Sequence, residues 1–321
     1  MIMGFIDAMR AEGHAVESTC RVLREQGCQV AARTYRAWRR QAPAARTVGD
    51  AQLVETIKQL CWVRDEQGVL RLTPEGLYGR RKLTAALRRR GLEVAECTVA
   101  RAMKTLGHQG VRRAKGLRST IPAKDGRRAG DLLDRDFTAA APNRTWVSDF
   151  TYVRSWAGFC YVAFIVDVFA QKIVAWHASS TKTVDLVMSP LRMALWQRDR
   201  EGRRPLLGEL ICHSDAGSQY TSLVFTEHLE LEGIRPSIGS VGDAYDNALM
   251  ETVIGLYKTE CIRTTVFHPG AYKTLADVEY ATAGWVDWYN HARLHSSLGM
   301  TTPVEYEQTH YAALNPVGSI T

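Results

Sequence analysis

The sequence predicts an α/β domain preceded by all-α helix-turn-helix units. Two observations support this fold class. From Asn143 onwards, three strand-like segments follow one another and helices then alternate with strands, as in a sheet covered by helices. Before residue 110, apolar positions recur at helical spacing and glycines interrupt them. A chain of 321 residues is also long enough for two or three compact units.

The N-terminal third is expected to be helical. Apolar periodicity predicts two short helices within 16–40 around Gly27, and further helices over 51–62, 77–90 and 96–106. The small, proline-bearing stretch Gln41–Thr47 is typical of a linker. The predicted division is a helix-turn-helix unit in 1–40, a linker in 41–50, a second, DNA-binding helix-turn-helix unit in 51–110 and a basic linker or arm in 111–142.

The α/β layer is expected in 143–265, followed by a C-terminal helix and tail in 266–321. The strands are predicted over 145–153, 159–169, 172–178 and 234–238, with one more ending at Asp215. The helices are predicted over 183–197, 221–232, through Glu251 to about Cys261, and over 276–292. From Leu298 the tail is expected to be irregular. Aromatic residues at helical spacing in the last helix indicate core packing: Trp285, Trp288 and Tyr289.

Composition excludes several classes of protein. The chain has no apolar run of membrane-spanning length, and its first residues do not form a signal peptide. The seven cysteines are scattered and never spaced CxxC, which argues against a disulfide framework and a structural zinc site. We therefore expect a protein without a membrane partner, in the cytoplasm.

The charge is unevenly distributed along the chain. Residues 1–130 hold 26 Lys and Arg against 12 Asp and Glu, whereas residues 131–321 hold 15 against 22. A basic first third is typical of a surface that binds a polyanion, although a solvated basic face is the simpler alternative. The candidate phosphate-binding residues are Arg80, Arg81, Lys82, Arg88, Arg89, Arg90, Arg112, Arg113 and Lys115.

Three acids stand where solvated surface charges are not expected. Asp149 interrupts a hydrophobic strand, Asp215 follows the end of another, and Glu251 lies on a helix. Clustered carboxylates repel one another unless a cation neutralises them. Hard oxygen ligands suit Mg²⁺ or Mn²⁺, and two such ions roughly 3.5–4 Å apart can support an in-line displacement at phosphorus.

The segments around these acids are WVSDFTYV, HSDAGSQYTS and YDNALMETVIGLYKTE, with 35 residues between Asp215 and Glu251. Together they closely resemble the DDE motif of transposases of the retroviral-integrase superfamily. The best match is the bacterial insertion-sequence family whose transposase is made from two overlapping reading frames, and the chain resembles the product of the second frame (orfB-type). The resemblance covers roughly Leu77 to Glu307.

This resemblance implies a ribonuclease H-like catalytic core, with a mixed five-stranded sheet and helices, behind the helix-turn-helix units. Asp149, Asp215 and Glu251 would be the catalytic and metal-binding triad for two Mg²⁺ ions, with Mn²⁺ as a substitute. Lys258, seven residues after Glu251 and on the same helix face, would hold DNA near the reacting phosphate. Asn247 is a further candidate for a DNA contact.

The implied activity is that of a DNA transposase, an endonuclease and polynucleotidyl transferase that cleaves and joins strands. Its implied partners are the terminal inverted repeats of the element, target DNA, a second copy of the chain in at least a dimer on DNA, and the first-frame product, fused or associated. Two alternatives remain open: a metal-dependent nuclease of the same fold without strand transfer, and a catalytically dead DNA-binding regulator.

Overall fold

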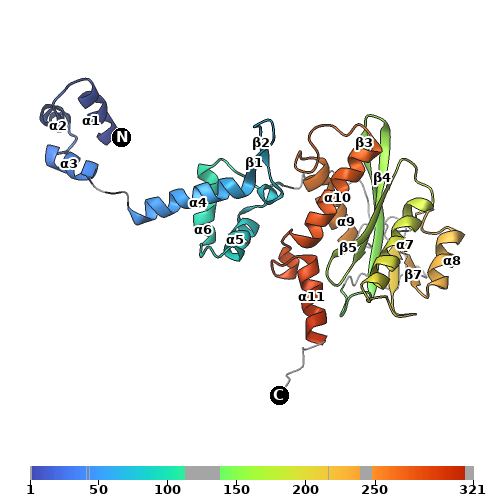
Figure 1. The fold of residues 1–321 in the computed structure, drawn as a ribbon. Coiled ribbons are helices and arrows are strands. Elements are labelled where there is room, and N and C mark those ends of the chain that lie inside the picture. The colour runs from blue at the N-terminus through green and yellow to red at the C-terminus, as the bar shows by residue number, and fades with distance from the viewer. Residues whose placement is uncertain are drawn as a thin grey trace, which may run out of the picture. The chain divides into compact units, whose positions relative to one another are not determined.

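The computed structural model describes residues 2–40, 42, 44–112, 138–215, 217–238 and 248–314. The chain divides into two compact units, Met1–Glu55 and Thr56–Thr321, and each is described by itself (Figure 1). Within the described ranges, no helix is both long enough and apolar enough to cross a membrane. All seven cysteines are free thiols.

The first unit is helical. Its helices are α1 (Ile2–Ala11), α2 (Val16–Glu25) and α3 (Ala32–Arg40). The latter two match the predicted pair around Gly27, whose φ of 83° suits glycine at the turn. Helix α1 was not predicted from the sequence. It contributes Ile6 to a small core with Cys20, Val30 and Tyr35.

The helical part of the second unit precedes the sheet. Helix α4 (Ala45–Cys61) begins inside the stretch 41–50 that the sequence assigns to a linker. It is followed by a short antiparallel hairpin, a 3₁₀ turn and two helices: β1 (Trp62–Arg64), β2 (Leu70–Leu72), η1 (Pro74–Leu77), α5 (Arg80–Arg89) and α6 (Glu96–Thr105). Leu83 and Leu87 of α5 and Val99 of α6 are fully buried, so the two helices pack through their apolar faces.

The predicted mixed five-stranded sheet is confirmed. Its strands are β3 (Thr145–Ser155), β4 (Gly158–Asp167), β5 (Lys172–Ser179), β6 (Ile211–Ser214) and β7 (Arg235–Ile238). Their order is β5-β4-β3-β6-β7, with β3, β4 and β5 antiparallel and with β6 and β7 parallel to β3. The central strands read as nearly continuous apolar runs because helices cover both faces of the sheet.

Two helices cover one face of the sheet, α7 (Asp185–Arg200) and α8 (Leu223–Leu231), through a core that includes Trp146, Leu191 and Phe225. On the other face lie α9 (Ala248–Leu256), the π-helical turn η2 (Tyr257–Ile262) and α10 (Leu275–His291) (Figure 1). The buried residues on this face include Trp285, Trp288 and Tyr289. Their burial confirms the predicted core packing of these aromatic residues.

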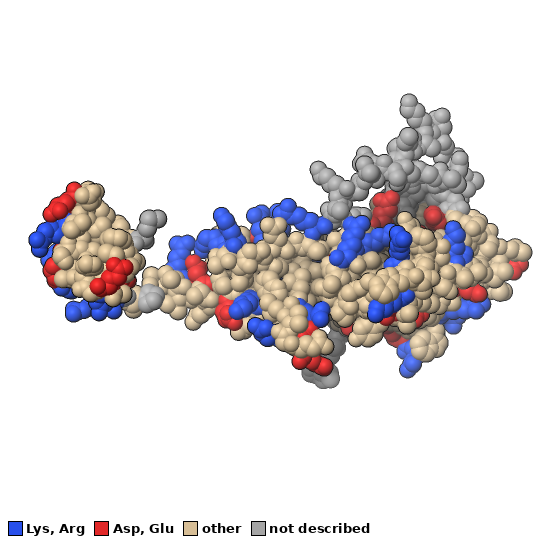
Figure 2. Space-filling model, turned by 90° about the horizontal axis from the view of Figure 1, so that it is seen from above, with Lys and Arg blue, Asp and Glu red and all other residues tan. Residues whose placement is uncertain are grey.

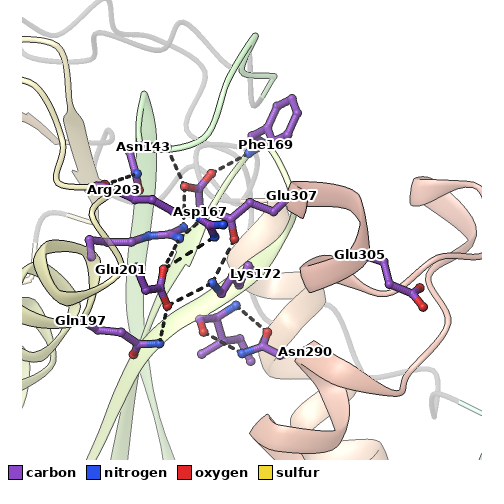
Figure 3. A network of polar contacts seen from close by, with 12 residues as sticks. Asn143, Asp167, Phe169, Lys172, Gln197, Glu201, Arg203, Asn290, Glu305 and Glu307 are labelled. Carbon is purple, nitrogen blue, oxygen red and sulfur yellow. Dashed lines mark hydrogen bonds and ion pairs between the residues drawn. The ribbon is translucent and has the colours of Figure 1, made fainter. Parts of the chain in front are cut away.

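The prediction of an irregular tail from Leu298 is wrong. After the short turn η3 (Ser296–Leu298), helix α11 runs over Pro303–Leu314. Its Glu307 is buried and bonds Arg198 Nη1 at 2.5 Å and Lys172 Nζ at 2.9 Å. Arg198 also contacts Asp167 at 3.3 Å. Figure 3 shows Glu307, Lys172 and Asp167 in this network of polar contacts. Helix α11 is thus fixed to the sheet by buried charges, which the hydrophobic pattern does not reveal.

Tyr78, just before α5, joins the helical part to the C-terminal part of the same unit. Its ring stacks on Trp288 at 5.9 Å. Its hydroxyl donates to the carbonyl oxygen of Ala292 at 3.3 Å and accepts from the Leu294 N–H at 3.0 Å. Because the hydroxyl bonds two backbone groups, one of them buried, the contact is specific as well as apolar.

Candidate active site

The sheet register brings two of the three predicted acids together. Ser148 of β3 is the parallel partner of Ser214, the last residue of β6. Asp149 and Asp215 each lie one residue further along their chains. Since neighbouring strands lie about 4.8 Å apart, the two carboxylates meet at the end of β6. This adjacency follows from the tertiary order of the strands and not from either sequence segment alone.

The electrostatics of Asp149 show how close the acids are. Its pKa is raised to about 7, first by burial, then by the carboxylate of Asp215, and to a smaller extent by that of Glu251. The Phe150 N–H, which donates to Asp149 Oδ1 at 2.7 Å, and the ammonium of Lys258 oppose this rise. All three acids and Lys258 therefore act on one site.

Glu251 comes from a helix that packs on the sheet and not from a strand. It lies in the first turn of α9, which packs against β3. The predicted helix continues beyond α9, but as the π-helical turn η2, which holds Lys258. Single π turns are frequent at functional sites. Burial lowers the pKa of Lys258, the charge of Arg263 lowers it further, and Asp149 raises it.

Several side chains behind the acids hold them in place. Gly217 N–H donates to Asp215 Oδ1 at 3.1 Å, and a Cβ at Gly217 would lie 2.9 Å from the same oxygen. A side chain at Gly217 would therefore displace the Asp215 carboxylate from this position. Next to Asp149 on β3, the Ser148 hydroxyl lies 3.0 Å from the buried Tyr220 hydroxyl. Local pattern does not reveal this role of Tyr220, because its partner Ser148 lies 72 residues away along the chain.

His213 is packed behind the site. It is buried, and its Nδ1 lies 2.9 Å from the Ser237 hydroxyl of β7. Within the ranges that the structure describes, no three His, Cys, Asp or Glu side chains form a ready-made metal cluster. The carboxylate donors themselves are of the type that Mg²⁺ prefers, and a cation would relieve the repulsion around Asp149.

The candidate phosphate-binding residues fall into three groups. Arg80, Arg81, Arg88, Arg90 and Arg112 are exposed, and Figure 2 shows blue Lys and Arg side chains along the part that holds α4 to α6. Arg80 also lies 2.7 Å from Glu96. Arg113 and Lys115 lie outside the described residues, as does Asn247.

The two remaining candidates, Arg89 and Lys82, contact the C-terminal part of the same unit. Arg89 forms an ion pair with Glu305 and donates to the carbonyl oxygen of Met300 at 3.3 Å. Lys82 is partly buried, with its Nζ 5.8 Å from the centroid of the Tyr78 ring. Burial lowers the pKa of Lys82 to about 7, and the charge of Arg293 acts in the same direction.

Comparison with known proteins places this geometry in a family. Two family models described as "Integrase core domain" match residues 139–244 and 232–303, and one described as "HTH-like domain" matches residues 49–116. The catalytic core of HTLV-2 integrase, solved in complex with magnesium, is 18% identical over 52% of this chain and 98% of its own, with a TM-score of 0.40.

Two relatives cover nearly the whole chain. A Mycobacterium tuberculosis protein named for the insertion sequence element IS986/IS6110 is 44% identical over 88% of this chain and 96% of its own length. The transposase of insertion sequence IS3A from Escherichia coli is 30% identical over 96% of this chain and 99% of its own length. The chain therefore belongs to the insertion-sequence transposases, a family of enzymes with a helix-turn-helix-like domain and an integrase core.

Proposed function

We propose that the chain cleaves one DNA strand at each end of its element and joins the freed 3′-hydroxyl to another strand, with Asp149, Asp215 and Glu251 as the catalytic acids. The register that places Asp149 beside Asp215 is the observation that carries this proposal. Chemistry is assigned to residues 143–265, and end recognition to residues 51–110, where the exposed arginines of α5 lie.

The same three carboxylates are proposed to hold two Mg²⁺ ions, for which Mn²⁺ can substitute. When bound, the ions activate the attacking oxygen and stabilise the leaving oxygen at phosphorus. The chain's own residues keep the ligands in place: Gly217 N–H orients Asp215, and the pair of Ser148 and Tyr220 supports β3 beneath Asp149. Lys258 is proposed to bind a phosphate beside the scissile bond.

The proposed partners follow from the reaction. Joining two element ends requires both in one complex, so we propose at least a dimer on DNA. The DNA partners are the terminal inverted repeats and then the target. Phosphate contacts are proposed for Arg80, Arg81, Arg88, Arg90 and Arg112, with Asn247, Arg113 and Lys115 as further candidates. Association with the first-frame product and residence at the nucleoid belong to the same proposal.

Substitution of the acids tests the catalytic assignment. Asp149→Asn, Asp215→Asn and Glu251→Gln should each abolish cleavage and joining while leaving binding of the element end largely intact, because the acids face the reacting phosphate. Asp185→Asn is the matched control, since Asp185 is exposed at the start of α7. Activity within about tenfold of wild type, which is about 1.4 kcal/mol of barrier, is too small a loss for a metal ligand and would sink the assignment.

A precut end separates the transposase from a nuclease of the same fold. The wild-type chain should join the free 3′-hydroxyl of such an end to a second duplex. Cleavage without joining would identify the nuclease, and binding without either reaction would identify the DNA-binding regulator.

The proposed role of Lys258 is tested on the same precut end. A charge-assisted contact with phosphate contributes about 1.5–3 kcal/mol, so Lys258→Ala should slow joining by about ten- to a hundredfold. Lys258→Arg should recover part of the rate because the charge is kept. Arg192→Ala, which removes an exposed cation on α7, should change little. Equal rates for Lys258→Ala and wild type would contradict the assignment.

A further inference from the structure

The β3–β4 hairpin exposes three aromatic side chains beyond the active site. Tyr152, Trp156 and Phe159 are 58%, 74% and 53% exposed. Along β3, exposed Tyr152 and Arg154 alternate with buried Val153 and Ser155. The rings of Tyr152 and Phe159 meet edge to face at 5.4 Å. Single exposed aromatic residues are common, whereas a cluster on one hairpin marks an interaction surface.

Cations accompany these rings. Lys258 Nζ lies 4.8 Å from the centroid of the Tyr152 ring, and Lys273 Nζ lies 5.5 Å from that of Trp156. Figure 2 shows Lys and Arg side chains gathered over the region of β3, β4 and α10. We call Tyr152, Trp156, Phe159, Lys258 and Lys273 the hairpin patch.

The hairpin patch is held rigidly. The Trp156 N–H donates to the carbonyl oxygen of Tyr272 at 3.0 Å, and the Ala157 N–H donates to that of Lys273 at 3.1 Å. These two bonds fix the turn of the hairpin to the segment before α10. A surface whose backbone is already ordered loses less conformational entropy when a partner binds.

The position of the hairpin patch relates it to the chemistry. The strand that carries Asp149 continues to Tyr152 and Trp156, about 10 and about 23 Å further on at about 3.3 Å per residue. Strand β6 pairs with β3 only up to Ser148. Among the described strands, the remainder of β3 therefore has a partner on one side alone, and the path from the acids to the hairpin patch follows this edge.

Building on the proposed function, we propose that the hairpin patch binds the DNA that leaves the active site, with its lysines on phosphates and its aromatic rings against bases and sugars. Interleaved cations and exposed aromatic rings are the surface that nucleic acid selects. A second copy of the chain fits less well, because a two-fold interface would set Lys258, Lys273 and Arg154 against their own copies. At about 3.4 Å per nucleotide, the contacts of Tyr152 and Trp156 would lie about three to seven nucleotides from the scissile phosphate, further along the DNA than the contact of Lys258.

Photocrosslinking of the full chain tests this inference. The probe is a duplex that ends in the element's terminal repeat, with 5-iodouracil at one position at a time. Crosslinks to the peptide containing residues 152–159 should appear with the label about three to seven nucleotides from the cleavage site, and not with it more than twice as far away. Trp156→Ala should abolish them and weaken end binding by about tenfold, which is about 1.4 kcal/mol.

Trp196→Ala is the matched control. Trp196 is 61% exposed on α7, with the Arg200 guanidinium carbon 4.9 Å from its ring centroid, so it shares the chemistry of Trp156 but not its position. This variant should crosslink as wild type does. Trp156→Phe should retain part of the signal. Because Trp156 is exposed, its removal opens no cavity, and circular dichroism should show an unchanged fold.

Two results would overturn the inference. In the first, the chain still joins ends, but the crosslink is unchanged in Trp156→Ala or no crosslink forms on the hairpin. The proposed function would then stand without the hairpin patch. In the second, Trp156→Ala changes the oligomeric mass of the protein in solution without DNA but does not change crosslinking. This result would assign the hairpin patch to self-association. Conversely, hairpin crosslinks together with wild-type cleavage by Asp149→Asn would refute the proposed function alone.

Discussion

Asp149→Asn should stabilise the chain in the absence of divalent ions. The folded chain raises the pKa of this carboxyl from 3.8 to about 7, so ionising it costs free energy that an amide does not. At about 1.36 kcal/mol per pKa unit the full difference is about 4 kcal/mol, and partial solvation reduces it to about 2–4 kcal/mol. Asparagine can still accept the Phe150 N–H bond through its side-chain oxygen.

The sign of the pH dependence follows from the same pKa. Between pH 3.8 and about 7 the folded chain retains a proton that the unfolded chain has released. Ionisation of this carboxyl therefore lowers the free energy of unfolding of the wild-type chain as pH rises through that window. The full loss of stability is present above about pH 7. The variant should exceed the wild type by about 2–4 kcal/mol at pH 8 and by almost nothing near pH 4.

Urea unfolding with EDTA, followed by tryptophan fluorescence, measures this difference. Asp185→Asn is the control and should be slightly less stable than wild type, because it loses a charge at the start of α7 that the helix dipole favours. Added Mg²⁺ should stabilise the wild type more than Asp149→Asn. If the variant is no more stable than wild type at pH 8 without metal, the crowding of carboxylates around Asp149 is not a real feature of the folded chain.

Three further outcomes concern buried groups elsewhere. Arg198→Met leaves the buried Asp167 carboxylate without its counter-charge and should cost about 3–5 kcal/mol in urea unfolding, whereas Arg204→Met, at an exposed position, should stay within about 0.5 kcal/mol. Tyr78→Phe removes an acceptor from a buried N–H and should cost about 1–3 kcal/mol, measured as a lower midpoint of unfolding. A thiol reagent should modify exposed Cys97 first, because burial raises the pKa of Cys212 to about 12.

Local pattern was sufficient to predict the strands and to single out Asp149 and Asp215 as candidate site residues. Asp149 stands out because a charge interrupts an apolar run, and Asp215 because it follows one. Their adjacency depends on β6 pairing with β3 across about sixty residues of intervening chain, and periodicity carries no information on strand order. The mixed sheet was therefore predicted through resemblance, and its register required the structure.

The features that the sequence did not reveal share a physical cause. The contacts of Arg89 with Glu305 and of Lys82 with the region of Arg293 join residues more than 200 positions apart. Helix α11 was missed because it buries Glu307 and Pro303 instead of an apolar stripe. Burial of charge and of isolated polar groups leaves no hydrophobic period to detect.

The bond between Glu307 and Arg198 has a consequence for synthesis of the protein on the ribosome. Strands β3 to β5 and helix α7 emerge early, and Arg198 then has Asp167 as a partner, but the Glu307 carboxylate reaches Arg198 and Lys172 only once α11 has been translated. Until then, a nascent core lacks these buried contacts and keeps an uncovered surface, a state that chaperones and proteases recognise. Ribosomes that stop before α11 should therefore leave products that are degraded rather than active fragments able to cut the host chromosome.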